Sequence, residues 1–143
     1  MYSGGIEGVP GLQTHLLTVC VGPICVYEAG DPEYSSVVLL HGAMYDESRF
    51  IWDQLFPFLA VSHHVFAIDT PRHGKSRPWE GVLNQAKLLE ILDGVFDALQ
   101  LQRFQLVGLS MGGALSIGYA TQHPDRVQSM VLFEPGGLGE KLD

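Results

Sequence analysis

Short apolar runs and helical apolar repeats alternate along most of this chain. The runs predict buried strands at residues 37–40, 65–68, 104–109 and 127–133. Between them, apolar residues recur at helical spacing over 84–99 and over 112–123, where Pro124 ends the second helix. Because strand and helix alternate, the pattern predicts a parallel sheet with right-handed crossovers and helices on both faces.

Two further strands precede this alternation. Residues 14–21 and 24–29 have the composition of strands and flank a Gly-Pro pair at 22–23, which predicts an antiparallel hairpin with its turn at that pair. Residues 1–12 are rich in glycine and lack an apolar period, so we expect a loose leader before a domain that spans 13–143. The predicted fold is α/β, with a mostly parallel sheet of about six strands that opens with an antiparallel hairpin.

The segment after the third strand is less clearly patterned. Apolar residues recur at helical spacing from Phe50 to Leu59, and Asp46 or Ser48 stands where a helix would be capped. Pro57 would bend this helix or end it early. We therefore expect one helix here, and the sequence leaves its C-terminal boundary open.

The bulk composition argues against several classes of protein. The chain has 143 residues, 46% of them hydrophobic, and a net charge of −8 with no run of like charge, so nucleic acid is not expected as a partner. No stretch approaches the roughly 18 consecutive apolar residues of a membrane span. The N-terminus has neither the basic region nor the apolar core of a signal peptide. We expect a cytoplasmic globular domain that does not bind a membrane.

The two cysteines are five positions apart. A turn at 22–23 would set Cys20 and Cys25 opposite each other on adjacent strands, where a disulfide is sterically conceivable. Nothing in the sequence points to secretion, so we expect two free thiols. Because no histidine or third cysteine stands at the short spacing of a zinc site, we expect no metal.

One glycine-rich motif carries candidate chemistry. Residues Gly108 to Gly112 fit G-x-S-x-G, and the motif stands between a predicted strand and a predicted helix, which is the context of a nucleophile elbow. Such a turn holds the serine hydroxyl clear of the sheet and brings backbones so close that glycine fits best on either side. We therefore predict that Ser110 is a nucleophile; a glycine-rich turn of some other α/β protein is the alternative.

Acyl transfer also needs N–H groups that stabilise a developing oxyanion. The residue after the nucleophile supplies one donor, and a loop after an earlier strand supplies the other. Met111 N–H is the first candidate, and Ala43 N–H, in the loop 41–44 after the third strand, is the second. We expect His41 to brace this loop rather than to transfer protons, with Gly42 shaping it beside the site.

Three segments in order, residues 41–42, 69–76 and 108–113, resemble the α/β-hydrolase superfamily. The resemblance runs from residue 13 onward and is closest to esterase-like and carbon–carbon-bond hydrolases, whose loop after the fourth strand often reads D-x-P-G-H-G-x-S. This chain has Arg72 where that group usually has glycine. The resemblance implies a hydrolase of ester-type or carbon–carbon bonds that forms an acyl-enzyme on Ser110, with no metal or organic cofactor.

The resemblance also implies that this sequence corresponds to the N-terminal half of such an enzyme. A complete member continues through a cap and two more strands to its acid and its histidine. The last histidine here, His123, ends the helix after the motif, so we expect no base for Ser110 and little turnover by this chain alone. Glu134 follows the sixth strand, where some members keep the acid; the alternative is a carboxylate that lines the mouth of the site.

Other functions stay open at this point. The chain could be a non-catalytic interaction or complementation module derived from such a hydrolase, which would expose a sheet edge and an apolar face and would dimerise, swap or aggregate. The hydrolase hypothesis predicts a small acyl or ester substrate, together with a complementary C-terminal half or a homodimer. A flavodoxin-like or nucleotide-binding domain is disfavoured, because no phosphate-binding glycine loop follows the first parallel strand.

Overall fold

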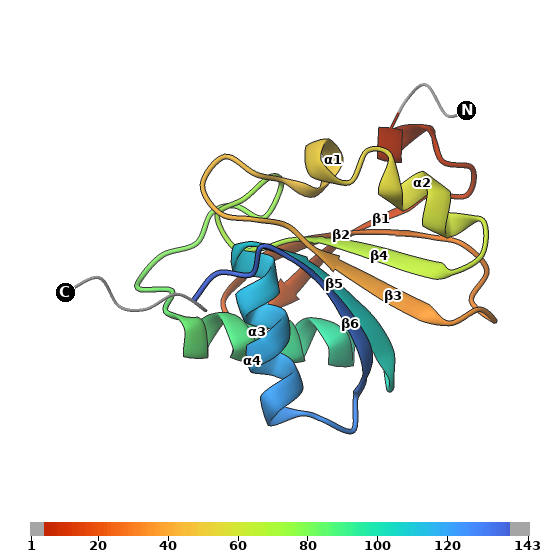
Figure 1. Cartoon of the computed structure of the whole chain (residues 1–143). Coiled ribbons are helices and arrows are strands. Elements are labelled where there is room, and N and C mark those ends of the chain that lie inside the picture. Colours follow the sequence, from red (N-terminus) through yellow and green to blue (C-terminus); the bar gives the residue numbers. More distant parts are fainter. Residues whose placement is uncertain (1–4, 138–143) are drawn as a thin grey trace.

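The computed structural model describes residues 5–137. In it the chain forms a six-stranded sheet with helices on both faces (Figure 1). The strands are β1 (Gln13–Val19), β2 (Gly22–Ala29), β3 (Ser36–Leu40), β4 (His64–Asp69), β5 (Phe104–Leu109) and β6 (Val127–Phe133). The helices are the 3-10 turn η1 (Gly5–Gly8) and α1 (Ser48–Ile51), α2 (Leu55–Ala60), α3 (Gln85–Ala98) and α4 (Met111–Gln122).

The strands lie in the order β1-β2-β4-β3-β5-β6. The β1–β2 and β2–β4 pairs are antiparallel, and the β4–β3, β3–β5 and β5–β6 pairs are parallel. The predicted fold, an α/β sheet of six mostly parallel strands that opens with a hairpin, is confirmed. Since parallel strands end at one edge of a sheet, the loops after β3, β4 and β5 meet at the same edge (Figure 1).

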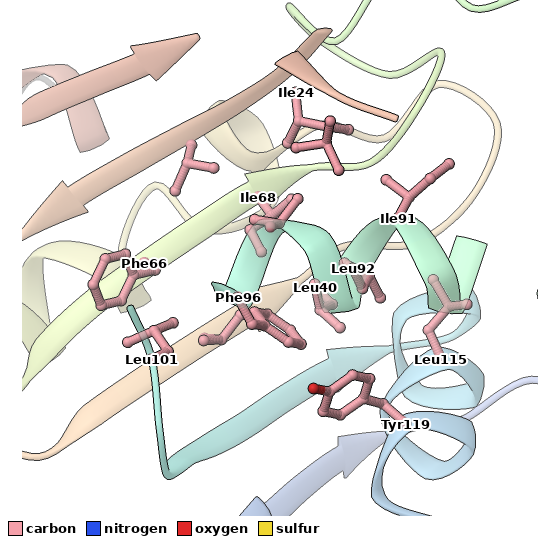
Figure 2. Close-up of a cluster of buried hydrophobic side chains, with 14 of the residues drawn as sticks. Ile24, Leu40, Phe66, Ile68, Ile91, Leu92, Phe96, Leu101, Leu115 and Tyr119 are labelled. Atoms are coloured by element: carbon pink, nitrogen blue, oxygen red, sulfur yellow. The ribbon is translucent and has the colours of Figure 1, made fainter. Parts of the chain in front are cut away.

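Side-chain alternation along the central strands divides the core into two layers. On β3, Val38 and Leu40 point toward α3 and α4, whereas Val37 and Leu39 point toward η1, α1 and α2. Figure 2 shows part of the first layer, in which the rings of Phe96 and Tyr119 contact each other edge to face, with centroids 4.9 Å apart. Both faces of the sheet are therefore covered over β3 and β4.

The turn of the opening hairpin is not where the sequence predicted it. Val19 pairs with Gly22, so the turn consists of Cys20 and Val21, and Cys20 adopts a φ of 55°, as the tight hairpin turn requires. Gly22 instead lies against the indole of Trp79, and a Cβ at this position would overlap the ring. Gly22 is thus required for close packing rather than for the turn.

Both cysteines are free, as expected, but they do not face each other. Cys20 is exposed in the turn, and Cys25 pairs with Leu16 on β1. Burial raises the pKa of the Cys25 thiol to about 11, with the nearby Asp69 carboxylate adding to the effect. A thiol with so high a pKa is unreactive at neutral pH.

Residues 5–12 differ from the loose leader that we expected. Ile6 is 1% exposed and Val9 is 7% exposed, and both belong to the apolar cluster that contains Trp52 and Phe56. One apolar side chain in a short 3-10 turn and a second just after it show no period that a sequence pattern could reveal. Residues 1–4, the rest of that segment, lie outside the described residues.

The single helix expected after β3 is two short helices. The break lies between α1 and α2, ahead of Pro57, which is the third residue of α2 and so needs no N–H for the helix. The N-cap of α1 is Glu47, which makes no side-chain capping bond. Neither predicted cap is used: Asp46 accepts a hydrogen bond from Gly42 N–H at 2.9 Å, and Ser48 is the first helical residue.

The packing of η1 can be tested by shortening its buried side chain. Ile6→Ala removes a fully buried side chain and is expected to lower the free energy of unfolding by about 2–4 kcal/mol. Leu16→Ala on β1 is the control, because Leu16 is 67% exposed, and it should change stability by less than about 0.5 kcal/mol. Urea denaturation followed by circular dichroism measures both; equal effects would mean that η1 does not pack as described.

Candidate active site

Ser110 occupies the sharp turn between β5 and α4. The residue is exposed and has a φ of 52°, a left-handed conformation that costs a serine about 1–3 kcal/mol. Neighbouring backbone holds it there: Ser110 N–H donates to Phe133 O at 3.0 Å, and Ser110 O accepts from Gly136 N–H at 2.9 Å. The strained serine is therefore fixed by the end of β6 and the turn that follows it.

The two glycines of the motif are required by close backbone contacts. A Cβ on Gly108 would overlap the carbonyl of Gly112, and a Cβ on Gly112 would overlap the carbonyls of Leu40 and His41. The start of α4 therefore lies directly against the end of β3. This contact brings the serine turn to the loop that follows β3.

The loop after β3 lies beside Ser110. A Cβ built on Gly42 would lie 3.7 Å from Ser110 Cβ. Gly42 N–H donates to the Asp46 carboxylate at 2.9 Å, and Asp46 N–H approaches Ala43 O at 3.4 Å, so the loop folds back on itself. Ala43 is exposed at this edge, and the structure thus brings together the loop and the turn that the sequence singled out.

His41 is fully buried at the base of this loop, and both of its ring nitrogens are used. Nδ1–H donates to Gly42 O at 2.6 Å, and Nε2 accepts from Thr70 N–H at 3.0 Å. Burial lowers the pKa of His41, the hydrogen bond to Gly42 opposes this effect, and the neighbouring His73 ring lowers the pKa further. A neutral ring with both nitrogens occupied is suited to bracing the loop and not to moving a proton from Ser110.

Asp69 is a buried carboxylate with a structural role that the sequence did not reveal. Oδ1 accepts from Ser48 N–H at 2.9 Å, and Oδ2 accepts from Lys75 N–H at 3.1 Å. Its backbone carbonyl accepts from the Ser76 hydroxyl, which in turn accepts from Cys25 N–H at 2.8 Å. Asp69 therefore organises its own loop and the start of α1; the only sequence signal was its place at the head of the 69–76 motif.

Arg72, where similar sequences usually have glycine, adopts a φ of 70°. This left-handed conformation explains why glycine suits the position. The arginine side chain compensates, because Nε–H donates to Trp79 O at 3.2 Å and the guanidinium also donates to Gly81 O. Arginine in place of glycine thus keeps the left-handed conformation of the loop, and its side chain adds hydrogen bonds to the segment before α3.

Glu134 lies at the same edge, between the two residues that hydrogen-bond the Ser110 backbone. It is exposed, has a φ of 43°, and lines an open groove of about 700 Å³. The apolar residues of this groove are Ile51, Trp52, Leu55, Leu109, Leu132 and Phe133. On β6, Met130 and Val131 are 38% and 54% exposed, so the last strand is largely uncovered by the described part of the chain.

The chain's six histidines all lie in the described region, and none hydrogen-bonds the Ser110 hydroxyl there. His15 and His64 each contact a carboxylate oxygen of Glu28, at 2.7 and 2.6 Å. His63 contacts Ser62, His123 stacks on Tyr119, and the remaining two are His41 and His73. Within residues 5–137, therefore, no histidine is hydrogen-bonded to Ser110.

Comparison with known sequences identifies the family. Residues 36–142 match the sequence profile of the α/β hydrolase fold. The chain belongs to the α/β hydrolase family. A 2-hydroxy-6-oxo-6-phenylhexa-2,4-dienoate hydrolase of Comamonas testosteroni is 34% identical to this α/β hydrolase over 121 residues, which cover 78% of the chain and 40% of the relative.

Other relatives of this α/β hydrolase have varied names. A 2-hydroxymuconate semialdehyde hydrolase of Pseudomonas sp. (strain CF600) is 36% identical over 88 residues, 61% of the chain and 31% of the relative. A dihydrolipoyllysine-residue acetyltransferase component of an acetoin cleaving system from Pseudomonas putida is 33% identical over 117 residues, 82% of the chain and 31% of the relative. The chain thus spans less than half the length of these curated relatives.

Solved structures agree with this assignment. A bacterial membrane phospholipase A superposes with a TM-score of 0.85 at 28% identity, covering 96% of this chain and 44% of that protein. The naproxen esterase of Bacillus subtilis superposes with a TM-score of 0.81 at 25% identity, covering 89% and 45%. Within residues 5–137 of this α/β hydrolase, no helix has the length and apolar character needed to cross a membrane.

The buried neutral state of His41 predicts a pH dependence of stability. Folded His41 has a lowered pKa, so below the ordinary value of 6.5 the unfolded chain binds a proton that the folded chain does not. The free energy of unfolding should therefore decrease as the pH falls below about 6.5. His41→Gln should flatten this slope relative to the half-buried His63→Gln control, as measured by urea denaturation between pH 7.5 and 5; an unchanged slope would contradict a neutral buried His41.

The left-handed conformation of Arg72 predicts an unusual order of variants. Arg72→Ala loses the hydrogen bonds to Trp79 and Gly81 and keeps a side chain at an unfavourable φ. Arg72→Gly loses the same hydrogen bonds, but glycine adopts this φ without strain. Arg72→Gly should therefore be more stable than Arg72→Ala by about 1 kcal/mol. Thermal unfolding of the two variants measures the difference; an alanine variant that is the more stable would contradict the described backbone conformation.

Proposed function

We propose that this chain supplies the nucleophile and the oxyanion hole of a serine hydrolase that forms an acyl-enzyme on Ser110. The observation that carries the proposal is the exposed Ser110 in a strained turn, facing the loop that contains Gly42 and Ala43. A strained serine between a strand and a helix, with glycine on either side, has the geometry of a nucleophile elbow.

In the proposed reaction, the Ser110 hydroxyl attacks the substrate carbonyl while its proton passes to a base. The carbonyl oxygen becomes an oxyanion, which the N–H groups of Ala43 and Met111 stabilise by hydrogen bonds. Collapse of the tetrahedral intermediate expels the leaving group with a proton and leaves an ester on Ser110. Water then attacks that ester, the acid product leaves, and the proton returns to the serine oxygen.

The substrate class we propose is a small molecule with an ester-type or carbon–carbon bond next to a carbonyl. Support comes from relatives named as carbon–carbon hydrolases and from structures named as esterases. Glu134 is the candidate for the acid of a triad, because it flanks Ser110 at the mouth of the site. The alternative is that the Glu134 carboxylate only lines the mouth of the site. We propose a cytoplasmic location for this activity.

Full activity requires a base from outside residues 5–137. The two nitrogens of His41 are already occupied, and no other histidine of this chain contacts Ser110. Without a base, the serine hydroxyl is a weak nucleophile. We therefore propose that the chain alone turns over little or no substrate, and that a complementary C-terminal portion of the fold supplies the base.

The uncovered β6 edge favours a second candidate function. An apolar groove of about 700 Å³ and the exposed Met130 and Val131 form a surface suited to another protein segment. On this alternative, the chain is a non-catalytic interaction or complementation module, present as a homodimer or bound to a partner, and Ser110 has no chemical part.

Labelling by a fluorophosphonate probe distinguishes the two functions. The probe is added to this chain alone and to the chain mixed with the C-terminal portion of the Comamonas hydrolase, the part beyond the aligned region, and adducts are read by intact-protein mass spectrometry. We expect one adduct in the mixture and little on the chain alone. Ser110→Ala should abolish labelling, whereas Ser129→Ala, which removes another exposed serine, should not change it.

Labelling that survives Ser110→Ala would overturn the assignment of the nucleophile. The absence of labelling in every sample, together with a stable dimer by analytical ultracentrifugation, would favour the interaction module.

A further inference from the structure

A chain of hydrogen-bond contacts runs from the half-buried His73 to the loop that faces Ser110. His73 Nδ1 lies 3.0 Å from Pro71 O and 3.2 Å from Thr70 Oγ1. A carbonyl oxygen can only accept, so this nitrogen carries a hydrogen. Thr70 Oγ1 also lies 3.3 Å from His41 Nε2, and the rings of His41 and His73 have centroids 4.9 Å apart.

The direction of each bond in the chain follows from the groups at its ends. His41 Nδ1 faces Gly42 O and must donate, while Nε2 faces Thr70 N–H and must accept. The Thr70 hydroxyl therefore donates to His41 Nε2 and accepts from His73 Nδ1–H. The sequence of donations runs from His73 through Thr70 and His41 to the carbonyl of Gly42.

The last of these bonds controls the orientation of one peptide group. Gly42 C=O and Ala43 N–H belong to the same planar trans peptide and point in opposite directions. Holding the oxygen toward the buried His41 ring turns the Ala43 N–H away from that ring, and Ser110 is close by, with its Cβ 3.7 Å from a Cβ built on Gly42. Asp46 fixes the preceding peptide by accepting from Gly42 N–H. Among residues 5–137, no acceptor is bonded to Ala43 N–H.

We propose that Thr70 and His73 are positioning residues that act through His41 to aim the Ala43 N–H at the oxyanion of the Ser110 reaction. The inference rests on the proposed function, since it assigns residues that orient one donor of its oxyanion hole. Loss of the Thr70 hydroxyl removes one of the two donors to His41 Nε2 and so loosens the ring that holds the Gly42–Ala43 peptide, which weakens the donor in the transition state. Neither Thr70 nor His73 touches the reacting atoms.

The charge state of His41 is part of the arrangement. A proton on Nε2 would face the Thr70 N–H, which can only donate, and the hydrogen bond from that N–H would be lost. Burial and the neighbouring His73 ring lower the pKa of His41, while the Asp69 and Asp46 carboxylates act in the opposite direction. Burial is the largest cause of the lowered pKa and His73 adds to it, so the removal of His73 should shift the protonation of His41 to higher pH.

Two measurements test the proposal. In the first, histidine 15N chemical shifts of this chain, recorded across pH 4.5–8, should show His41 as the neutral Nδ1–H tautomer. His73→Gln should shift the His41 titration, and the acid limb of probe labelling in the complemented mixture, to higher pH. His63→Gln should shift neither.

In the second measurement, the fluorophosphonate labelling rate of the complemented mixture is compared among Thr70 variants. Thr70→Val keeps the shape and removes the hydroxyl, and it should slow labelling about tenfold, the value of one lost hydrogen bond. Thr70→Ser should restore the rate. Thr121→Val is the matched control, because the Thr121 hydroxyl bonds Ile117 O on the exposed side of α4, and it should leave the rate unchanged.

The possible results test this inference separately from the proposed function on which it rests. An Nε2–H tautomer of His41 would overturn the inference, as would wild-type labelling by Thr70→Val or equal slowing by Thr70→Val and Thr70→Ser. Absence of labelling in the wild-type mixture would count against the proposed function itself. In that case the tautomer of His41 and its titration in the His73→Gln variant would decide whether the hydrogen bonds from His73 to Gly42 are arranged as described.

Discussion

The contact between the start of α4 and the end of β3 sets the position of everything at the candidate site. Gly112 lies so close to the carbonyls of Leu40 and His41 that no side chain fits between them, and Gly108 faces Gly112 in the same way. This backbone contact places the turn at Ser110, with its left-handed conformation, beside Gly42. Glycine is therefore required here by packing.

Buried polar groups then connect the loop after β3, the start of α1 and the loop after β4 at this edge of the sheet. A buried carboxylate or imidazole without partners is unfavourable by several kcal/mol, so each must be satisfied by neighbouring groups. Asp69 finds its partners in Ser48 and Lys75, and His41 finds its partners in Thr70 and Gly42. Because Asp69 binds the start of α1 and His41 binds Thr70, the loops after β3 and β4 do not hold their conformations independently of each other.

Strand β6, in contrast, is partly uncovered. Its neighbour β5 is buried between two layers, whereas Met130 and Val131 of β6 are exposed and the groove beside Phe133 is open. The groove and Ser110 share one edge of the sheet, since Leu109 lines the groove and Glu134 flanks the serine. A segment that covers the groove would therefore also approach the serine hydroxyl, which is the position a base requires.

The sequence by itself determined the strands, the two long helices and the family motif, because each depends on a local period or on adjacent residues. The strands at 104–109 and 127–133 and the helix over 84–99 needed no distant partner to be recognised. Only the tertiary structure decided the turn at Cys20, the burial of Ile6 and the neutral state of His41. Each of these depends on contacts between segments far apart in the sequence, such as Trp79 against Gly22 or Thr70 against His41, and no local pattern records such contacts.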